Sequence, residues 1–516
     1  MAKFITAQNA ARLIPDGATI GVSGMGLSGW AEEVGSAIAE NFRQTGHPKN
    51  LSLKQGCDLG DFENRGVDHL GEPGLVKKWC SGHAASATKL MAQAAENKIE
   101  YHCLPQGAIV NLWREIGAGR PGLLTKVGLG TFADPRISGG RMNSAAKDTL
   151  VELVDFRGEE YLFYKAFKLD VAILRGTTAD EAGNITYEHE SMTNEGFHVA
   201  NAAKRSGGIV IVQVRHLAKS GTLNPQNVRI PGVMVDYVVQ ATDVKNHWQT
   251  EVGRYDPAFS GQVKKPMSAI KPLPFDEKKI ICRRCAMEVR RGFMINLGVG
   301  IPSSVAKVVA EEGFISEVSL SGESGVIGGV TARPNCAYNP DAYISHNEMF
   351  DFIDGGGLDM TCLGIGEIDQ FGNNNVSRLG KKLSGPGGFI NISTSAQKVI
   401  FCGALRGKAE LQVADGALKV LKEGPLQKFV SEVAQITFAG AYKRADQTVL
   451  YITERCVFEL IDGKMVLIEI APGLDLQKDI LDQIGFTPEI SPTLKLMDKE
   501  IFHENWGGLG KYILQN

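Results

Sequence analysis

Phe293-Met-Ile-Asn-Leu-Gly-Val-Gly-Ile-Pro302 joins a short apolar run to a glycine turn, and a helix-like segment follows over residues 303–312. An apolar strand that passes through a glycine turn into a helix is the usual opening of an α/β unit. The same order occurs near the start of the chain, where an apolar strand over residues 18–22 leads through glycines into a helix predicted over residues 31–45. Both openings predict an α/β fold.

A second pattern is also present twice. Asp180-Glu-Ala-Gly-Asn184 and Asp369-Gln-Phe-Gly-Asn373 share aspartate, glycine and asparagine at the same spacing. Each is followed, at nearly the same distance, by an apolar strand-like run, 209–214 in the first case and 399–402 in the second. A preserved offset of this kind indicates duplicated units. The distance back to the opening glycine turn is longer in the first half, which predicts an insertion within residues 60–150.

Prolines and lysines interrupt the periodic pattern over residues 255–275, as expected of a linker. We therefore predict two related open α/β/α domains, residues 1–254 and 276–516, joined by a proline-rich linker over residues 255–275. Ligands of open α/β sheets bind beyond the carboxyl ends of the strands, so the cleft between the halves is the expected site.

The composition excludes several classes of function. The 516 residues carry a net charge of −3, which gives no support for binding to nucleic acid or to a membrane surface. The nine cysteines are scattered and odd in number, which favours a reducing compartment, and Cys282 and Cys285 form a lone C-x-x-C that is expected on a helix and not at a metal. The N-terminus lacks a signal-peptide core, and no run approaches the ~20 apolar residues of a membrane span. We predict a cytoplasmic protein without a metal.

Leu320-Ser-Gly-Glu-Ser-Gly-Val-Ile-Gly-Gly-Val330 places one carboxylate, Glu323, in a glycine-rich turn after a short apolar segment. Glycines allow sharp turns and close approach of a ligand to the backbone. The alternative is a turn glutamate that faces water. Gly298-Val-Gly-Ile-Pro-Ser303 lacks the third glycine of a dinucleotide-binding turn, and neither a G-x-S-x-G nor a phosphate-binding P-loop is present.

The remaining candidate chemistry is attack by a carboxylate on a thioester, with the oxyanion stabilised by backbone N–H groups of a glycine turn. The second glycine cluster, Ser384-Gly-Pro-Gly-Gly-Phe389, could supply those donors. It could equally be a plain loop before a strand over residues 389–392, and composition and spacing do not separate the two.

These residues together resemble a known family, the class I CoA-transferases, specifically the single-chain acetate/propionate CoA-transferase type with both homologous halves fused. The resemblance covers essentially the whole chain. It rests on Asn296-Leu-Gly-Val-Gly-Ile-Pro302, Glu323-Ser-Gly-Val-Ile-Gly-Gly329, Asp351-Phe-Ile-Asp-Gly-Gly-Gly-Leu-Asp359, Gly387-Gly-Phe-Ile-Asn-Ile392, Tyr451-Ile-Thr-Glu-Arg-Cys456, Pro105-Gln-Gly107, Gly128-Leu-Gly-Thr-Phe-Ala-Asp-Pro135 and Arg175-Gly-Thr-Thr-Ala-Asp-Glu-Ala-Gly-Asn184.

The resemblance implies that Glu323 is the catalytic glutamate, which would form an acyl-glutamyl anhydride and then a glutamyl-CoA thioester. It further implies that Gln106 reaches Glu323 from the first domain and that Gly387 or Gly388 is the oxyanion-hole glycine. The CoA site would be lined by Asn296, Gly298 and Gly300. CoA would be a substrate, and no cofactor or metal would be needed. Trp30 stands where many members have proline, so the acid accepted is left open.

The expected partners are therefore acyl-CoA and short-chain carboxylic acids, and the family suggests a homodimer or homotetramer. Two alternatives use the same scaffold: an acyl-CoA hydrolase, in which water replaces the acceptor acid, and a non-catalytic CoA- or ligand-binding module, because fold does not fix function.

Overall fold

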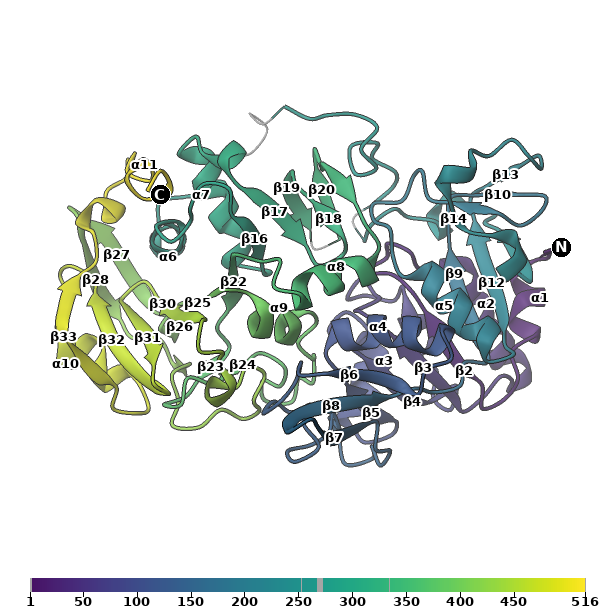
Figure 1. The fold of residues 1–516 in the computed structure, drawn as a ribbon, viewed down its shortest axis with the longest axis horizontal. Helices are drawn as coiled ribbons and strands as arrows, with labels where there is room; N and C mark the ends of the chain where they lie inside the picture. The colour runs from purple at the N-terminus through teal and green to yellow at the C-terminus, as the bar shows by residue number, and fades with distance from the viewer. Residues whose placement is uncertain (1, 252, 267–271, 334, 516) are drawn as a thin grey trace.

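The computed structural model describes residues 2–251, 253–266, 272–333 and 335–515. Two large sheets organise these residues, one from each half of the chain (Figure 1). They lie on either side of residues 255–275, of which 267–271 fall outside the described residues. The boundaries of the two domains and of the linker between them therefore stay a prediction.

The first sheet has eight strands, and all of its pairings are parallel. Its strand order is β1 (Lys3–Phe4), β15 (Tyr237–Gln240), β12 (Ile209–Val214), β9 (Val171–Arg175), β2 (Thr19–Val22), β3 (Leu51–Gln55), β4 (Val76–Ser81) and β5 (Glu100–Cys103).

The second sheet has ten strands, with a parallel centre and antiparallel additions at both sides. Its strand order is β21 (Ala342–Tyr343), β18 (Val326–Ile327), β17 (Ser319–Gly322), β16 (Met294–Leu297), β22 (Met360–Gly364), β25 (Lys398–Cys402), β30 (Thr448–Ile452), β31 (Cys456–Ile461), β32 (Lys464–Ile470) and β33 (Glu489–Leu496).

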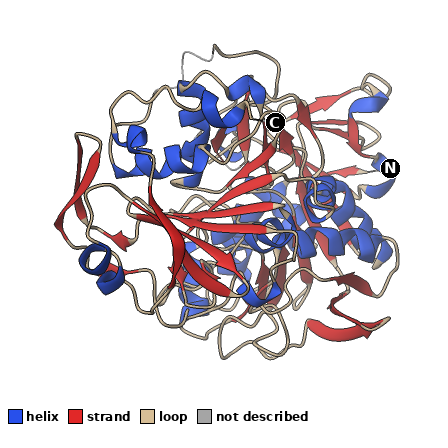
Figure 2. Ribbon diagram, turned by 60° about the vertical axis from the view of Figure 1, so that its left-hand side comes forward, coloured by secondary structure: helices blue, strands red, loops and turns tan. Residues whose placement is uncertain are grey.

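The helices pack against the sheets, as Figure 2 shows. Those of the first half are α1 (Ala7–Arg12), α2 (Glu32–Thr45), α3 (Thr88–Ala95), α4 (Gln106–Gly117) and α5 (Gly196–Arg205). Those of the second half are α6 (Glu277–Ala286), α7 (Val305–Glu311), α8 (His346–Asp354), α9 (Phe389–Ser395), α10 (Leu476–Asp479) and α11 (Gly510–Ile513). Cys282 and Cys285 are both buried on α6, as expected.

Several smaller sheets lie outside the two large ones. They comprise β13 (His216–Ala218), β10 (Thr178–Asp180), β11 (Ile185–Thr186) and β14 (Val228–Ile230); β6 (Gly122–Thr125), β8 (Glu159–Lys165) and β7 (Val151–Phe156); and the pairs β19 (Val330–Arg333) with β20 (Cys336–Tyr338), β23 (Glu367–Ile368) with β24 (Asn374–Asn375), β26 (Arg406–Gly407) with β29 (Leu426–Gln427), and β27 (Glu410–Ala414) with β28 (Ala417–Lys422).

The predicted duplication is visible in the strand order. The first sheet contains β15-β12-β9-β2-β3, and the second contains β30-β25-β22-β16-β17, which are the corresponding strands in the same order. In the first half, β4, α3 and β5 lie beyond this shared order, inside the region where an insertion is expected.

The repeated Asp-Gly-Asn motif folds into the same turn twice. In the first half, Asp180 accepts hydrogen bonds from the backbone and the side chain of Asn184, whose side-chain oxygen accepts the backbone N–H of Gly232. In the second half, Asp369 and Asn373 make the same bonds, and the side-chain oxygen of Asn373 accepts the backbone N–H of Gly440. Identical turn chemistry at matching places supports two related halves.

The apolar core is continuous between the halves. Alternate residues of a strand point to opposite faces of its sheet, so Ala172 and Leu174 of β9 face the cluster that also contains Phe401 of β25. Helices α4 and α5 of the first half and α8 and α9 of the second pack into this shared cluster between the two sheets. Figure 1 shows α4, α8 and α9 side by side in the middle of the molecule.

One element differs from expectation. The apolar run over residues 389–392 is the first turn of α9 and not a strand. A buried run this short, here three apolar residues and Asn391, does not distinguish a strand from a helix by its periodicity. The run is buried on all sides because α9 lies inside the core shared by both halves.

Candidate active site

Glu323 lies at the tip of the turn between β17 and β18, beyond the carboxyl end of β17. The backbone N–H of Gly325 donates to the carbonyl of Gly322 at 3.0 Å, which closes a tight turn with Glu323 and Ser324 at its centre. Gly325 has a φ of +95°, and a Cβ there would collide with the carbonyl oxygen of Ile344. Only glycine fits this position, so the turn that presents Glu323 depends on it.

The carboxylate of Glu323 reaches the first turn of α9. The backbone N–H of Gly388 donates to Glu323 Oε2 at 3.1 Å. A Cβ on Gly388 would lie closer than 3.0 Å to the same oxygen. The absence of a side chain at Gly388 is therefore what lets the carboxylate approach this N–H group.

Gln106 approaches from the first half. It is the first residue of α4 and is fully buried, and its backbone N–H donates to the carbonyl of Gly387 at 3.3 Å. A Cβ built on Gly387 would lie 3.4 Å from Gln106 Oε1 and 3.8 Å from Glu323 Oε1. The two halves therefore meet at one site, where the first contributes Gln106 and the second contributes Glu323, Gly387 and Gly388.

Two histidines that sequence reasoning missed also face this place. His83 bonds through Nδ1 to Asp58 Oδ2 at 3.0 Å, and Asp58 also accepts the backbone N–H of Ser86. His346, the first residue of α8, is fully buried and lies 2.9 Å from Gln106 through the Nε2 atoms of both side chains. A single histidine or aspartate belongs to no sequence motif that would mark it as a site residue. His83 and His346 come close to Glu323 only because the chain folds as it does.

The electrostatics of the site follow from burial. Burial raises the pKa of the Glu323 carboxyl above its ordinary value, and the positive charges of His346 and His83 and the N–H of Gly388 offset this only in part. Burial lowers the pKa of His83, but the hydrogen bond to Asp58 and the negative charges of Asp58 and Glu323 outweigh it, so the net shift is upward. Among the described residues, Glu323 forms no salt bridge, and its carboxylate accepts a hydrogen bond from the backbone N–H of Gly388.

Three predicted CoA-site residues lie at the neighbouring strand end. Asn296 of β16 is buried, and its side-chain amide donates to the carbonyl of Ser321 at 3.1 Å, so it ties β16 to β17. Gly298 and Gly300 belong to the loop that follows β16, and Val299 between them is 74% exposed. Within the described chain, none of the three predicted residues hydrogen-bonds to Glu323, although the loop shares its sheet edge.

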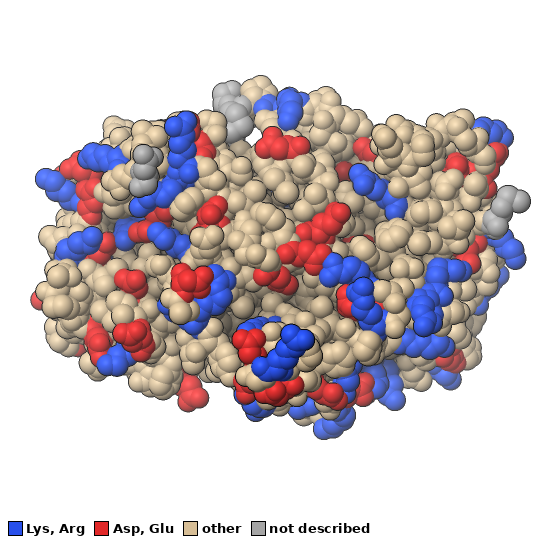
Figure 3. All heavy atoms as spheres, in the orientation of Figure 1, with Lys and Arg blue, Asp and Glu red and all other residues tan. Residues whose placement is uncertain are grey.

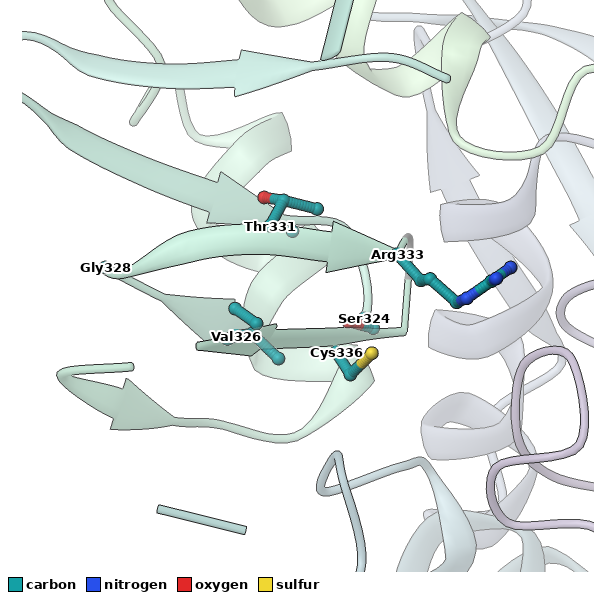
Figure 4. Close-up of a pocket in the computed structure, with 8 residues that line it drawn as sticks. Ser324, Val326, Gly328, Thr331, Arg333 and Cys336 are labelled. Carbon is teal, nitrogen blue, oxygen red and sulfur yellow. The ribbon is translucent and has the colours of Figure 1, made fainter. Parts of the chain in front are cut away.

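The surroundings of Glu323 are partly apolar. Met25, Cys57 and Met192 form a small buried cluster apart from the main cores, and the negative charge of Glu323 raises the pKa of the Cys57 thiol, after burial itself. A separate narrow pocket lies beside the end of β17, next to the turn that contains Glu323 (Figure 4), between Gly322 and Cys336, but it is too narrow for a water molecule. Trp30 lies in the core that covers the other face of the first sheet and does not join the Met25 cluster.

Basic and acidic side chains are interspersed over the face shown in Figure 3. In the described part of the chain, no three or more His, Cys, Asp or Glu side chains are grouped so that they could hold a metal ion. None of the described helices has the length and apolar character needed to cross a membrane.

Comparison with known proteins identifies the family of the chain. The family model "Coenzyme A transferase" matches residues 4–241. A caffeate CoA-transferase from Acetobacterium woodii is 57% identical, with 99% of each chain covered. Acetate CoA-transferase YdiF from Escherichia coli K12 is 41% identical, with 96% of this chain and 94% of YdiF covered.

Solved structures lead to the same family. The crystal structure of the YdiF apoenzyme from Escherichia coli O157:H7 has a TM-score of 0.94 at 40% identity, with 99% of this chain and 98% of that chain covered. A further YdiF structure, with a TM-score of 0.93, is described as a thioester complex with CoA. The chain is therefore a member of the coenzyme A transferase family, a class I CoA-transferase enzyme that carries both halves on one polypeptide.

Proposed function

We propose that this enzyme transfers CoA between an acyl-CoA and a free carboxylic acid by a ping-pong route in which Glu323 becomes covalently joined to CoA. The observation that carries the proposal is a carboxylate with a raised pKa, held beside the backbone N–H of Gly388 at the junction of the two halves. A carboxylate that is partly desolvated and fixed in position is a stronger nucleophile than one in water.

The chemistry balances without redox change. Glu323 attacks the thioester carbonyl carbon, the C–S bond breaks, and an acyl-glutamyl anhydride and CoA thiolate form. The thiolate then attacks the glutamyl carbonyl, the first acid leaves as its carboxylate, and a glutamyl-CoA thioester remains. An acceptor carboxylate reverses these steps and regenerates free Glu323. One thioester replaces another, so we propose that neither ATP nor a metal or other cofactor takes part.

In this route the tetrahedral oxyanions need hydrogen-bond donors. The backbone N–H of Gly388 already lies 3.1 Å from a carboxylate oxygen of Glu323, and the side chain of Gln106 faces the same place. Loss of one such donor typically costs about 10²–10³-fold in rate. We assign Gly388 and Gln106 to this role, and Gly298 and Gly300, beside the exposed Val299, to the surface that CoA crosses.

Acetate and propionate are the first acids we propose. The Met25, Cys57 and Met192 cluster beside Glu323 favours a second candidate, a larger acid of the caffeate type, because thioether and thiol groups pack well against aromatic rings. The 57% identity to a protein named caffeate CoA-transferase also supports this candidate. A homodimer or homotetramer in the cytoplasm remains our proposal from the resemblance.

The test is a set of acyl-CoA donors against acetate, propionate and caffeate, with free CoA measured in parallel. We expect transfer to depend on the acceptor and to be lost in Glu323→Ala. Mass spectrometry of enzyme trapped with acyl-CoA and borohydride should find the modification on the peptide that contains Glu323. Full transfer by the alanine variant would refute the proposal, and release of CoA at the same rate without any acceptor would favour a hydrolase.

A further inference from the structure

Three side chains form a buried chain that ends at Gln106. Glu195 directly precedes α5, His346 begins α8 and Gln106 begins α4, and each is fully buried. Glu195 Oε2 lies 2.9 Å from His346 Nδ1, and His346 Nε2 lies 2.9 Å from Gln106 Nε2. The chain therefore connects the first half to the second and returns to the first beside Glu323.

The buried carboxylate of Glu195 lies against the ring of His346. A fully buried carboxylate is costly unless an opposite charge compensates it. Among the described residues, the Glu195 carboxylate pairs with His346 through Oε2, and its buried Oε1 has no hydrogen bond. An imidazolium at His346 neutralises this carboxylate, and both of its ring nitrogens then carry hydrogen.

A charged His346 also fixes the orientation of Gln106. In one orientation of the amide, Gln106 Nε2 faces His346 Nε2 at 2.9 Å, and the buried Oε1 of Gln106 has no partner among the described residues. The oxygen and nitrogen ends of an amide are nearly identical in shape and are assigned from the hydrogen-bond network. Turning the amide lets Gln106 Oε1 accept the N–H of His346 and places the NH2 group on the side of Glu323.

We propose that Glu195 and His346 are positioning residues, whose ion pair holds Gln106 with its amide N–H toward Glu323 and the developing oxyanion. This inference rests on the proposed function of Glu323. An N–H donor at this place stabilises negative charge on the reacting group, whereas a carbonyl oxygen would repel it.

The duplication explains how Glu195 reaches this place. Leu53 pairs with Ile20 in the first sheet as Leu320 pairs with Ile295 in the second, so Gly56, three residues beyond Leu53, corresponds to Glu323. A Cβ on Gly56 would lie 3.1 Å from Glu195 Oε1. In the first half, glycine therefore occupies the position that corresponds to Glu323. The carboxylate of Glu195 lies beside Gly56, where a side chain would otherwise be.

The test uses Glu195→Gln and His346→Gln in the full enzyme, because both keep hydrogen-bonding capacity and remove the charge. We expect kcat for transfer to fall at least about tenfold, with KM for acyl-CoA changed less than about twofold. The acid limb of kcat/KM should move to higher pH, because a positive charge that favours ionised Glu323 is lost. His198→Gln, three residues after Glu195 and on α5, is the matched control and should keep wild-type kcat and pH profile.

A double-mutant cycle shows whether the pair acts through Gln106. In a Gln106→Ala background, His346→Gln should cost less than about twofold, because the side chain that it orients is already absent. Wild-type kcat and pH profile in both single variants would overturn the proposal, and so would equal losses in the two backgrounds. Full transfer by Glu323→Ala would instead overturn the proposed function itself, so the two failures are distinguishable. If one charge variant does not fold, the other completes the cycle.

Discussion

Replacement of Gly388 by alanine is a direct test of the geometry around Glu323. The backbone of Gly388 has φ −75° and ψ −4°, a conformation that alanine adopts without strain. The added Cβ would lie closer to Glu323 Oε2 than the 3.0 Å that real Cβ atoms respect. The end of the glutamate side chain can move away, so we expect the protein to fold with a Tm within a few degrees of the wild type.

The carboxylate, however, must retreat by about 1 Å, and a misplacement of that size costs about 10²-fold in rate. The hydrogen bond from Gly388 N–H lengthens at the same time. Steady-state transfer assays of Gly388→Ala should therefore show kcat lower by about 10²-fold. Gly364→Ala is the control, because a Cβ there meets nothing within 4 Å. The reasoning is refuted if Gly388→Ala keeps half of wild-type kcat or if Gly364→Ala loses as much.

Three further outcomes are expected. Because the pKa of Glu323 is raised, kcat/KM for acyl-CoA should begin to fall at a pH above the ordinary glutamate value of 4.5, and an acid limb at or below that value would contradict it. Burial raises the pKa of Asp354 to about 7 despite the hydrogen bonds from Asn391, so between pH 4 and 7 the folded state holds a proton that the unfolded state releases. The free energy of unfolding should therefore fall as the pH rises from 4 to 7, by at most about 4 kcal/mol. Urea unfolding of Asp354→Asn should lack this decline. Gly325→Ala should lower Tm sharply, because it combines a φ of +95° with a collision against Ile344, and an unchanged Tm would show that the turn can rearrange.

The elements that followed from the sequence were those whose pattern is local. The strand-turn-helix openings and the two Asp-Gly-Asn turns depend on residues close together in the chain, and both are present as expected. The convergence of Glu323 with Gly388 was expected only through the family resemblance, because 65 residues separate them. No spacing rule relates such distant positions.

The remaining parts of the site depend on contacts between the halves. His346 and Gln106 are 240 residues apart, and His346 and Glu195 are 151 apart, so only the packing of α4, α5 and α8 brings them together. The sequence suggests a strand over residues 389–392 for a related reason: the apolar residues of this segment are compatible with either structure, and packing in the shared core makes it a helix.

The uninterrupted apolar layer between the sheets also restricts how substrates enter and leave. Halves joined by a small polar interface can hinge open, whereas a large hydrophobic one resists such movement. Rocking one half away from the other would strip Phe350 and Trp113 from the layer that they share and expose both rings to water. We therefore expect acyl-CoA to reach Glu323 past surface loops and not through an opening between the two halves.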